Sequence, residues 1–354
     1  MSIKVAYITL SRKGGMIHYI RQLITHLPES IDSILITRMI PDVIPRTTCY
    51  RFGLDFKNIL SEYRKIVETI QLFDPDIIHI TSGHILLLPL MRKFRHKPIV
   101  ITLHDVIPHT GENTWLHRLI IAGQIRSSTH IFVHGSLQKG ELIKGGISEN
   151  KISVIPHGDY SFFRDYQLDA ISEEDSVLFF GRIVEYKGLN RLLDVMIMLG
   201  NKYRFKLIIA GEGNLAPYQE KIRRINHELI EVHNQFIDDE QVARFFQRAK
   251  LVVLPYMEGT QTGIIPIAYA FSKPVIATDV GSFSEAIEDG KTGLLIPPNN
   301  SEMLKNAIIR LMTDDSVRKE MGKNGYLKMN TDLSWDTVLS GTLPIYSQII
   351  EMNK

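Results

Sequence analysis

Residues 251–278 read LVVLPYMEGTQTGIIPIAYAFSKPVIAT, and this stretch decides the fold class. Two runs rich in Val, Ile and Leu, Leu251–Pro255 and Pro274–Thr278, flank an apolar helical segment, Gly263–Phe271. Continuous apolar runs of this kind are typical of strands that are buried on both faces of a parallel sheet. A strand, a helix and a second strand in succession therefore predict one βαβ unit.

The same alternation continues toward both ends of the chain. Short apolar runs rich in β-branched residues recur between helical patterns, and each run is predicted to be a strand. The other predicted strands are Lys4–Leu10, Ser33–Thr37, Asp76–Thr81, Pro98–Leu103, His130–Val133, Lys151–Ile155, Ser176–Phe180, Lys206–Ala210, Ile230–Asn234 and Gly293–Ile296. Predicted amphipathic helices include Met16–Leu27, Phe56–Leu72, Leu189–Leu199 and Ser301–Thr313.

The pattern restarts near residue 175, after the polar segment Gln167–Asp175, which we interpret as a linker. The length of 354 residues also favours two domains. The predicted fold class is therefore α/β, with two doubly wound parallel sheets. Ligands of such sheets bind beyond the carboxyl ends of the strands, so we expect the two sets of strand ends to face a central cleft.

The composition is that of an ordinary globular protein, with 44% hydrophobic and 23% charged residues. A net charge of +2 gives no reason to expect a nucleic-acid partner. Cys49 is the only cysteine, which excludes an intramolecular disulfide and favours a reducing compartment. No apolar run reaches the ~18 residues that span a bilayer. The N-terminus is patterned as a strand rather than a signal peptide, so we expect a cytoplasmic protein.

Two glycine-containing turns lie between a predicted strand and a predicted helix. The run RKGG at residues 12–15 follows the first strand, and Gly181–Gly188 follows the first strand of the second half. The second run contains Arg182 and Lys187, a fork-shaped donor and a point charge suited to a diphosphate. Glycines let backbone N–H groups approach an anion at a helix start. Each turn is either such an anion site or a plain tight turn.

Two further loops end predicted strands in the second half. The glycines of the run AGEGN, Ala210–Asn214, indicate a close approach of the backbone to a ligand or to a neighbouring loop. The loop Thr260–Gly263 precedes a helix, so its neutral donors can hold an anion while Glu258 accepts from hydroxyl groups. Alternatively, Thr260 or Thr262 caps the helix.

His104 closes the predicted strand Pro98–Leu103 and is therefore expected at the edge where ligands bind. A single histidine at such a place is either a structural hydrogen-bonding residue or a functional one. His157 is expected to shape the crossover between the domains. The remaining histidines of this half that we considered, His109, His130 and His134, are interpreted as structural.

Taken together, these segments resemble the retaining GT-B glycosyltransferases of glycosyltransferase family 4 over nearly the whole chain. The order and spacing of the motifs are specific, although no single motif is. The motifs are Gly14-Gly15, Thr102–Asp105, Val154–Gly158, Gly181–Gly188, Ala210–Asn214, Pro255–Gly259 and Lys273–Pro298.

The resemblance implies two Rossmann-like domains facing a cleft. An acceptor-binding domain would span 1–165 with a returning C-terminal helix at about 334–354, and a nucleotide-sugar-binding domain would span 170–333. Pro344 lies in the segment Ser334–Ile350 of that helix, so a kink or break is expected there.

The resemblance also implies the reaction. A retaining, metal-independent enzyme of the hexosyltransferase type would move a sugar from a UDP- or GDP-linked donor to a glycan or lipid-linked acceptor in surface polysaccharide biosynthesis. The nucleotide sugar is a co-substrate, and no cofactor, metal or histidine cluster that could hold a metal is expected at the site.

The resemblance also implies the site residues, which are assigned by their positions in the shared motifs. Arg182 and Lys187 would hold the diphosphate, His104 would lie beside the sugar, and Glu258 would accept from sugar hydroxyls, which makes these four the candidate catalytic residues. The candidate donor-binding residues are Gly14, Gly15, Gly181, Gly211, Glu212, Gly213, Thr260, Gln261, Thr262, Gly263 and Ile264.

One position departs from the family. The second acid of the E-x7-E element, which usually holds the ribose, is replaced by Pro266. The chain resembles a variant subgroup with TQ[ST]G loops, in which Gln261 or Thr262 would supply some of the polar contacts. The missing acid also supports an alternative, a non-catalytic partner or scaffold subunit in a glycan assembly complex.

A basic cluster with one aromatic, Arg92–Lys97, lies in the presumed acceptor domain. Such patches attract anionic lipid surfaces, which a lipid-linked acceptor would make useful. The cluster is therefore either a peripheral contact with the inner face of a membrane or a solvated helix end.

Overall fold

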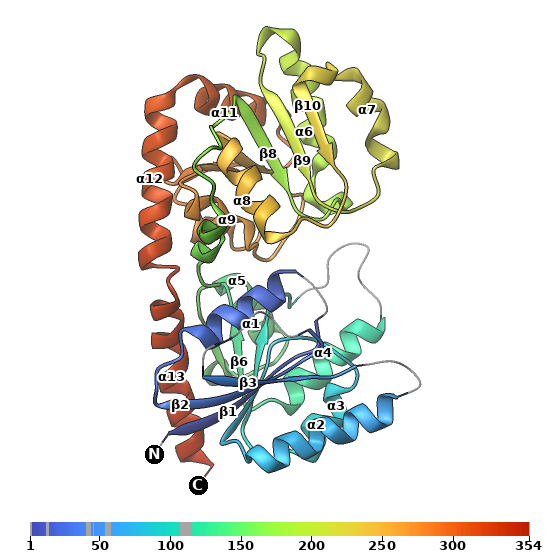
Figure 1. Cartoon of the computed structure of the whole chain (residues 1–354), viewed down its shortest axis with the longest axis vertical. Coiled ribbons are helices and arrows are strands. Elements are labelled where there is room, and N and C mark those ends of the chain that lie inside the picture. Colours follow the sequence, from blue (N-terminus) through green and yellow to red (C-terminus); the bar gives the residue numbers. More distant parts are fainter. Residues whose placement is uncertain are drawn as a thin grey trace. The chain divides into compact units, whose positions relative to one another are not determined.

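The computed structural model describes residues 2–11, 14–39, 44, 46–53, 58–106 and 115–353. The chain forms two compact units. In Figure 1 the first is coloured blue to green, with its C-terminal segment in dark red, and the second is coloured green to orange-red. The first unit comprises Met1–Gly158 and Ser334–Lys354, and the second comprises Asp159–Leu333. The segment Gln167–Asp175, interpreted as a linker, lies inside the second unit, where Leu168 exchanges two hydrogen bonds with Gln247.

The first unit contains a seven-stranded parallel sheet in the order β3-β2-β1-β4-β5-β6-β7. Its strands are β1 Ile3–Thr9, β2 Ile31–Thr37, β3 Thr47–Arg51, β4 Ile77–Ile80, β5 Ile99–Leu103, β6 His130–Val133 and β7 Ile152–Val154. Sequence analysis finds all of these except β3. Its residues, TTCYR, are partly exposed at the sheet edge, so they lack the continuous apolar run that marks the buried strands.

Helices cover both faces of this sheet. The helices are α1 Gly15–Thr25, α2 Ile59–Phe73, α3 Leu87–Lys93, α4 Trp115–Ser127, α5 Ser136–Lys144 and α13 Trp335–Met352, with a 3₁₀ turn at Glu149–Lys151. Apolar residues of α2, α3, α4 and α5 share one core with the sheet, while those of α1 and α13 share the other. Phe56, the expected first residue of α2, lies outside the described residues.

Helix α13 runs without interruption through Pro344, so of the kink or break predicted there, the break is wrong. The proline lies on the exposed side of the helix, where water can reach the carbonyl group that it leaves unpaired. The opposite side is held by buried packing of Trp335, Val338 and Tyr346 against the sheet. This packing outweighs the local preference of proline to end a helix.

The second unit contains a six-stranded parallel sheet in the order β10-β9-β8-β11-β12-β13. Its strands are β8 Ser176–Phe180, β9 Lys206–Ala210, β10 Ile230–His233, β11 Leu251–Leu254, β12 Val275–Thr278 and β13 Gly293–Ile296. Its α-helices are α6 Leu189–Leu199, α7 Gln219–Arg224, α8 Asp239–Arg248, α9 Ile264–Ala270, α10 Phe283–Ala286, α11 Ser301–Thr313 and α12 Asp315–Thr331. Its 3₁₀ turns are η2 Ser161–Tyr166, η3 Glu185–Lys187, η4 Gly200–Lys202, η5 Ala216–Tyr218 and η6 His227–Leu229. Two parallel sheets flanked by helices confirm the predicted α/β fold class.

In each sheet there is one point at which the order of the strands reverses, so that successive strands are added first on one side and then on the other. In the first unit this point lies between β1 and β4, and in the second it lies between β8 and β11. Loops that leave neighbouring strands on opposite sides open a crevice at such a switch point, which is where open α/β sheets bind ligands. The fold therefore directs the search for a site to the loops after these four strands.

Among the described residues, none of the helices combines the length and apolarity needed to cross a membrane.

Candidate functional site

The loops after β8 and β9 pack closely on each other in the second unit. Gly181 N–H donates to Ala210 O at 2.9 Å, and Ile183 N–H donates to Glu212 O at 2.8 Å. A Cβ atom on Gly211 would lie 2.0 Å from Gly181 O, and one on Gly213 would lie 2.2 Å from Ile183 O. Of the two interpretations of this motif, the structure shows the approach to a neighbouring loop, while the side chain of Glu212 is exposed.

The loop after β8 carries two cations, Arg182 near its start and Lys187 near its end. The side chain of Lys187 is buried, and its ammonium lies 5.2 Å from the centre of the Tyr256 ring, a cation–π contact. The guanidinium of Arg182 donates to the hydroxyl of Tyr186 at 3.3 Å. A Cβ atom on Gly181 would lie 2.7 Å from the Lys187 ammonium, so glycine at this position leaves room for that group.

The loop after β11 is joined to the same place. Met257 N–H donates to Tyr186 O at 2.7 Å, and Ile264 Cδ1 lies 3.2 Å from the position of a Cβ atom on Gly181. Burial raises the pKa of the Tyr256 hydroxyl, while a hydrogen bond with Thr262 and the charge of Arg182 oppose the rise. The structure thus brings Arg182, Lys187 and the Thr260–Gly263 loop together at the switch point of the second unit.

The start of α9 supports part of the capping alternative. Gly263 occupies the N-cap position and Thr262 Oγ1 accepts a hydrogen bond from Ile264 N–H at 3.2 Å. Pro266 is the third residue of α9, where a missing N–H leaves no helical hydrogen bond unmade. Glu258 is half-buried in the preceding loop.

Sequence analysis assigns no role to Tyr186, Tyr256 or Ser282. Ser282 N–H donates to Thr260 O at 2.9 Å, which places the loop after β12 against the Thr260 loop. The Ser282 hydroxyl and Gln261 Oε1 are buried polar atoms that make no hydrogen bond within the described residues, so they can serve a ligand. Ser282 lies in the loop after the predicted strand Pro274–Thr278, a signal that could have found it, whereas the tyrosines have no comparable signal.

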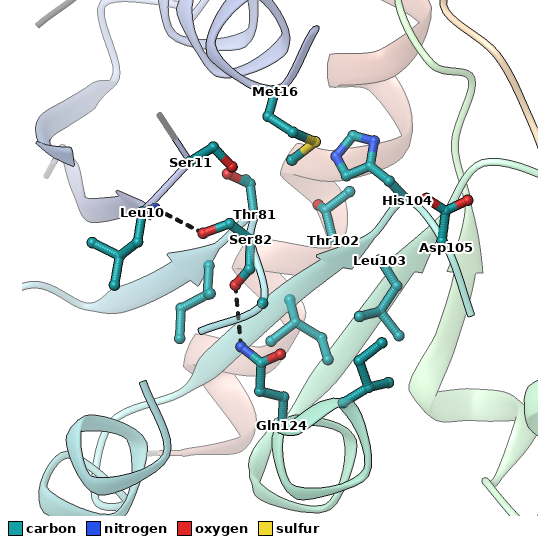
Figure 2. A pocket seen from close by; sticks show the side chains of 14 residues that line it. Leu10, Ser11, Met16, Thr81, Ser82, Thr102, Leu103, His104, Asp105 and Gln124 are labelled. Carbon is teal, nitrogen blue, oxygen red and sulfur yellow. Dashed lines mark hydrogen bonds between the residues drawn. The ribbon is translucent and has the colours of Figure 1, made fainter. Parts of the chain in front are cut away.

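The switch point of the first unit holds a cavity of about 230 Å³ (Figure 2). Its floor is formed by apolar side chains of β4, β5 and α4, and its polar lining includes Ser82, Asp105 and Gln124. Ser82 joins the loops that line it, since its hydroxyl accepts from Leu10 N–H at 2.7 Å and its carbonyl accepts from Gln124 at 3.2 Å. The cavity can take a small polar group on an apolar base.

Ser11 and Met16, on either side of the first glycine turn, line this cavity. Gly14 adopts a left-handed conformation with φ 81° as the N-cap of α1, and a Cβ atom there would meet nothing within 4 Å. Gly15 is the first residue of α1. Arg12 and Lys13 lie outside the described residues.

His104 forms one wall of the cavity and belongs to a group of three histidines. Ring nitrogens of His104, His134 and His157 all lie within 4.8 Å of one another. The ring of Tyr19 makes edge contacts with all three, at centre-to-centre distances of 4.8, 5.3 and 5.6 Å. Burial lowers the pKa of His134 to about 4 and that of His104 and His157 well below the ordinary value, so all three rings are neutral at pH 7.

The histidine group corrects the sequence-based expectation that no such cluster lies at the site. Its members lie at the ends of β5, β6 and β7, which are neighbours in the sheet but are separated by whole helices in the sequence. His134, interpreted as structural, is part of the group, whereas His130 instead bonds Ser153 at 2.9 Å. His109 lies outside the described residues.

The basic cluster Arg92–Lys97 is only partly a surface patch. Arg92, Lys93 and Arg95 are exposed, but Lys97 pairs with Asp74 at 2.7 Å. Phe94 packs in the core, so the cluster offers no aromatic ring to a membrane surface. The part of the membrane interpretation that rests on this aromatic is wrong.

Two family models match the chain. Residues 13–158 match Glycosyltransferase Family 4, and residues 165–328 match Glycosyl transferases group 1. The two matched segments cover most of the chain and meet close to the boundary between the two units.

Individual relatives agree with these models. An uncharacterized glycosyltransferase of Methanocaldococcus jannaschii, MJ1178, is 32% identical over 56% of this chain and 52% of its own length. O-antigen chain mannosyltransferase C of Escherichia coli is 27% identical over 57% of this chain and 56% of its own length. The matches thus span little more than half the length of these curated relatives. The Anabaena protein HepE, solved with UDP-glucose, is 16% identical and superimposes with a TM-score of 0.78 over 98% of this chain and 100% of that one, a likeness of fold.

Proposed function

The chain belongs to the group 1 glycosyltransferases of family 4, and on this premise we propose that it moves a sugar from a nucleoside-diphosphate sugar to an acceptor with retained anomeric configuration. The observation that carries the proposal is the convergence of Arg182, Lys187 and the Thr260–Gly263 loop at the switch point of the second unit. A diphosphate carries two negative groups, which suit the guanidinium of Arg182 as a fork-shaped donor and the ammonium of Lys187 as a point charge.

The second unit is the donor-binding unit in this proposal. Arg182 and Lys187 hold the diphosphate, whose negative charge grows as the bond to the sugar breaks. Cations that are already in place stabilise this charge without reorganisation, which lowers the barrier to transfer. Glu258 accepts hydrogen bonds from the sugar hydroxyls, and the departing phosphate takes the acceptor proton, so the mechanism uses no metal.

The ribose is held without an acid at Pro266. The buried Gln261 Oε1 and the Ser282 hydroxyl lie in loops that contact each other and can accept hydrogen bonds from a diol. In this proposal, Gln261 of the TQTG loop takes over a contact with the ribose that the second acid makes in the usual family pattern.

The first unit is the acceptor-binding unit in this proposal. The cavity beside His104 takes the acceptor group, and His104 lies next to the transferred sugar while Gly14 and Gly15 allow a close approach. We assign a glycan or lipid-linked acceptor in surface polysaccharide biosynthesis, in line with the E. coli relative named as an O-antigen mannosyltransferase. The donor is UDP- or GDP-linked, and the enzyme acts in the cytoplasm or at the inner membrane face.

Removal of either cation tests the diphosphate assignment. We expect Arg182→Ala and Lys187→Met to lower transfer by about 10²–10³-fold, because each removes a group that stabilises developing charge. Arg204→Ala is the control, since it removes an exposed guanidinium of the same unit that pairs with Glu228 at 3.0 Å. Calorimetric titration with UDP- and GDP-sugars separates binding from turnover. Parent-like transfer by both cation variants would contradict the assignment.

A second candidate is a non-catalytic subunit of a glycan assembly complex, which Pro266 favours. Thermal-shift screening with UDP-, GDP- and ADP-sugars separates the two candidates, because a ligand that binds only the folded chain raises its melting temperature. An enzyme requires stabilisation by at least one of these donors. A chain that none of them stabilises, with acceptors present, is a scaffold.

A further inference from the structure

The three histidines, of which His104 lines the cavity, are held close together by the residues around them. Gln138, which is 1% exposed, donates to His104 O at 2.7 Å and accepts from His134 N–H at 2.9 Å. One amide therefore fixes the ends of β5 and β6 relative to each other. His157 joins the group at the loop after β7, and Tyr19 packs against all three rings.

One ring has the hydrogen bonding of a metal ligand. His134 Nδ1–H donates to Ile155 O at 3.2 Å, which fixes the tautomer and leaves the lone pair of Nε2 available. His134 is 7% exposed, and its Nε2 has no hydrogen-bond partner among the described residues. A buried acceptor without a donor requires either a ligand or a compensating interaction.

We propose that His104, His134 and His157 form a binding site for a divalent transition-metal ion of the zinc class. Three imidazole nitrogens with a fourth position open are an established ligand set for such ions. Nitrogens that share a tetrahedral ion at about 2.0–2.1 Å lie about 3.4 Å apart. The ring nitrogens of the three histidines lie within 4.8 Å of one another, so an ion would draw them closer to a common centre.

The chemistry of the ligands selects against hard cations. Mg²⁺ and Ca²⁺ prefer oxygen ligands, and the group itself offers only nitrogen. His104 also lines the cavity, which provides a route for an ion from solvent.

The site has a consequence that rests on the proposed function. The same imidazole of His104 would contact either the ion or the transferred sugar, so the two are alternatives. Occupancy by metal therefore inhibits transfer, although the metal takes no part in the reaction.

Cobalt titration tests the site without any nucleotide sugar, so its outcome is independent of the proposed function. The full chain is treated with chelator, dialysed and titrated with Co²⁺, whose visible absorption intensifies when nitrogen ligands bind it at low coordination number. We expect one Co²⁺ per chain, displaced by Zn²⁺. A parent chain that shows neither the absorption nor saturable Zn²⁺ binding by calorimetry would overturn the proposal.

Matched variants localise the ion. His134→Gln should weaken binding at least tenfold, whereas His130→Gln, on the same strand and bonded to Ser153, should bind like the parent. His157→Gln repeats the test at a half-buried position, in case His134→Gln does not fold. If whichever of these two variants folds binds the metal ion as tightly as the parent does, the ion is held by other residues and the proposed site is wrong.

Inhibition is then measured with a donor and acceptor that the parent uses. Zn²⁺ should inhibit the parent and His130→Gln at similar concentrations, and His134→Gln only at concentrations at least tenfold higher. Equal sensitivity of His134→Gln would refute the competition between ion and sugar, and the cobalt result would stand separately.

Discussion

At the scale of single residues, the second unit shows how glycine controls the position of a charge. Gly181 has φ 105° and leaves the space into which the Lys187 ammonium extends. A methyl group here meets the far end of a flexible side chain rather than backbone, so the fold can adapt while the ammonium is displaced. A substitution of Gly181 is therefore expected to affect ligand binding as well as stability.

Gly181→Ala should lower nucleotide-sugar affinity at least tenfold and cost about 1–2 kcal/mol of unfolding free energy, the strain of a left-handed non-glycine residue. Gly200→Ala is the matched control, because Gly200 also has a positive φ, 53°, but has nothing within 4 Å of its Cβ position. Calorimetry and urea unfolding measure the two effects. Equal donor affinity in the two variants would show that the Lys187 ammonium is not displaced or does not bind the donor.

The sequence is informative about residues that act within one loop. The runs containing Arg182, Lys187 and Thr260–Gly263 follow predicted strands, and parallel topology is enough to predict that they meet. The sequence does not reveal groups of side chains that are brought together from several strands. The contact of Tyr256 with Lys187 and the histidine group depend on side-chain packing that no local pattern encodes.

At the scale of elements, continuous apolar runs locate the buried strands, and the edge strand β3 is missed because it has no such run. Helix α13 shows the complementary limit. Local rules predict a kink or break at Pro344, and buried packing of Trp335 and Tyr346 keeps the helix from breaking. The unfavourable helix propensity of Pro344 therefore lowers the stability of the folded chain without breaking the helix.

Pro344→Ala should recover part of this cost. Alanine restores an N–H to the helix and is up to about 3 kcal/mol more favourable than proline in a helix interior. Because residue 344 is exposed, the change disturbs no core contact, and we expect a gain of about 1–2 kcal/mol in unfolding free energy. Ser347→Ala, at an exposed position of the same helix, should change stability by less than about 0.5 kcal/mol. A lower melting temperature for Pro344→Ala would mean that the helix is built around the proline.

At the scale of the whole molecule, the first unit keeps several histidines neutral in its interior. Burial lowers the pKa of His79 to about 3 and that of His130 to about 4. His79 bonds Thr102 at 2.7 Å and also bonds Tyr346, so this ring joins β4, β5 and α13. The unit is therefore assembled around groups that cannot be protonated without being exposed.

Stability should consequently fall as the solution becomes acidic. The pKa of a histidine in the folded unit is lower than its unfolded value of about 6.5, so below that pH the unfolded chain binds protons that the folded chain does not. A single such group with a folded pKa of about 4 removes about 2 kcal/mol of unfolding free energy between pH 7 and pH 5. His130→Gln should reduce the pH dependence by this amount. Ser153→Ala, which removes the partner of His130 but keeps the titrating ring, should retain the dependence. Urea unfolding at both pH values measures the effect, and an unchanged slope in His130→Gln would show that this ring is not held neutral by the fold.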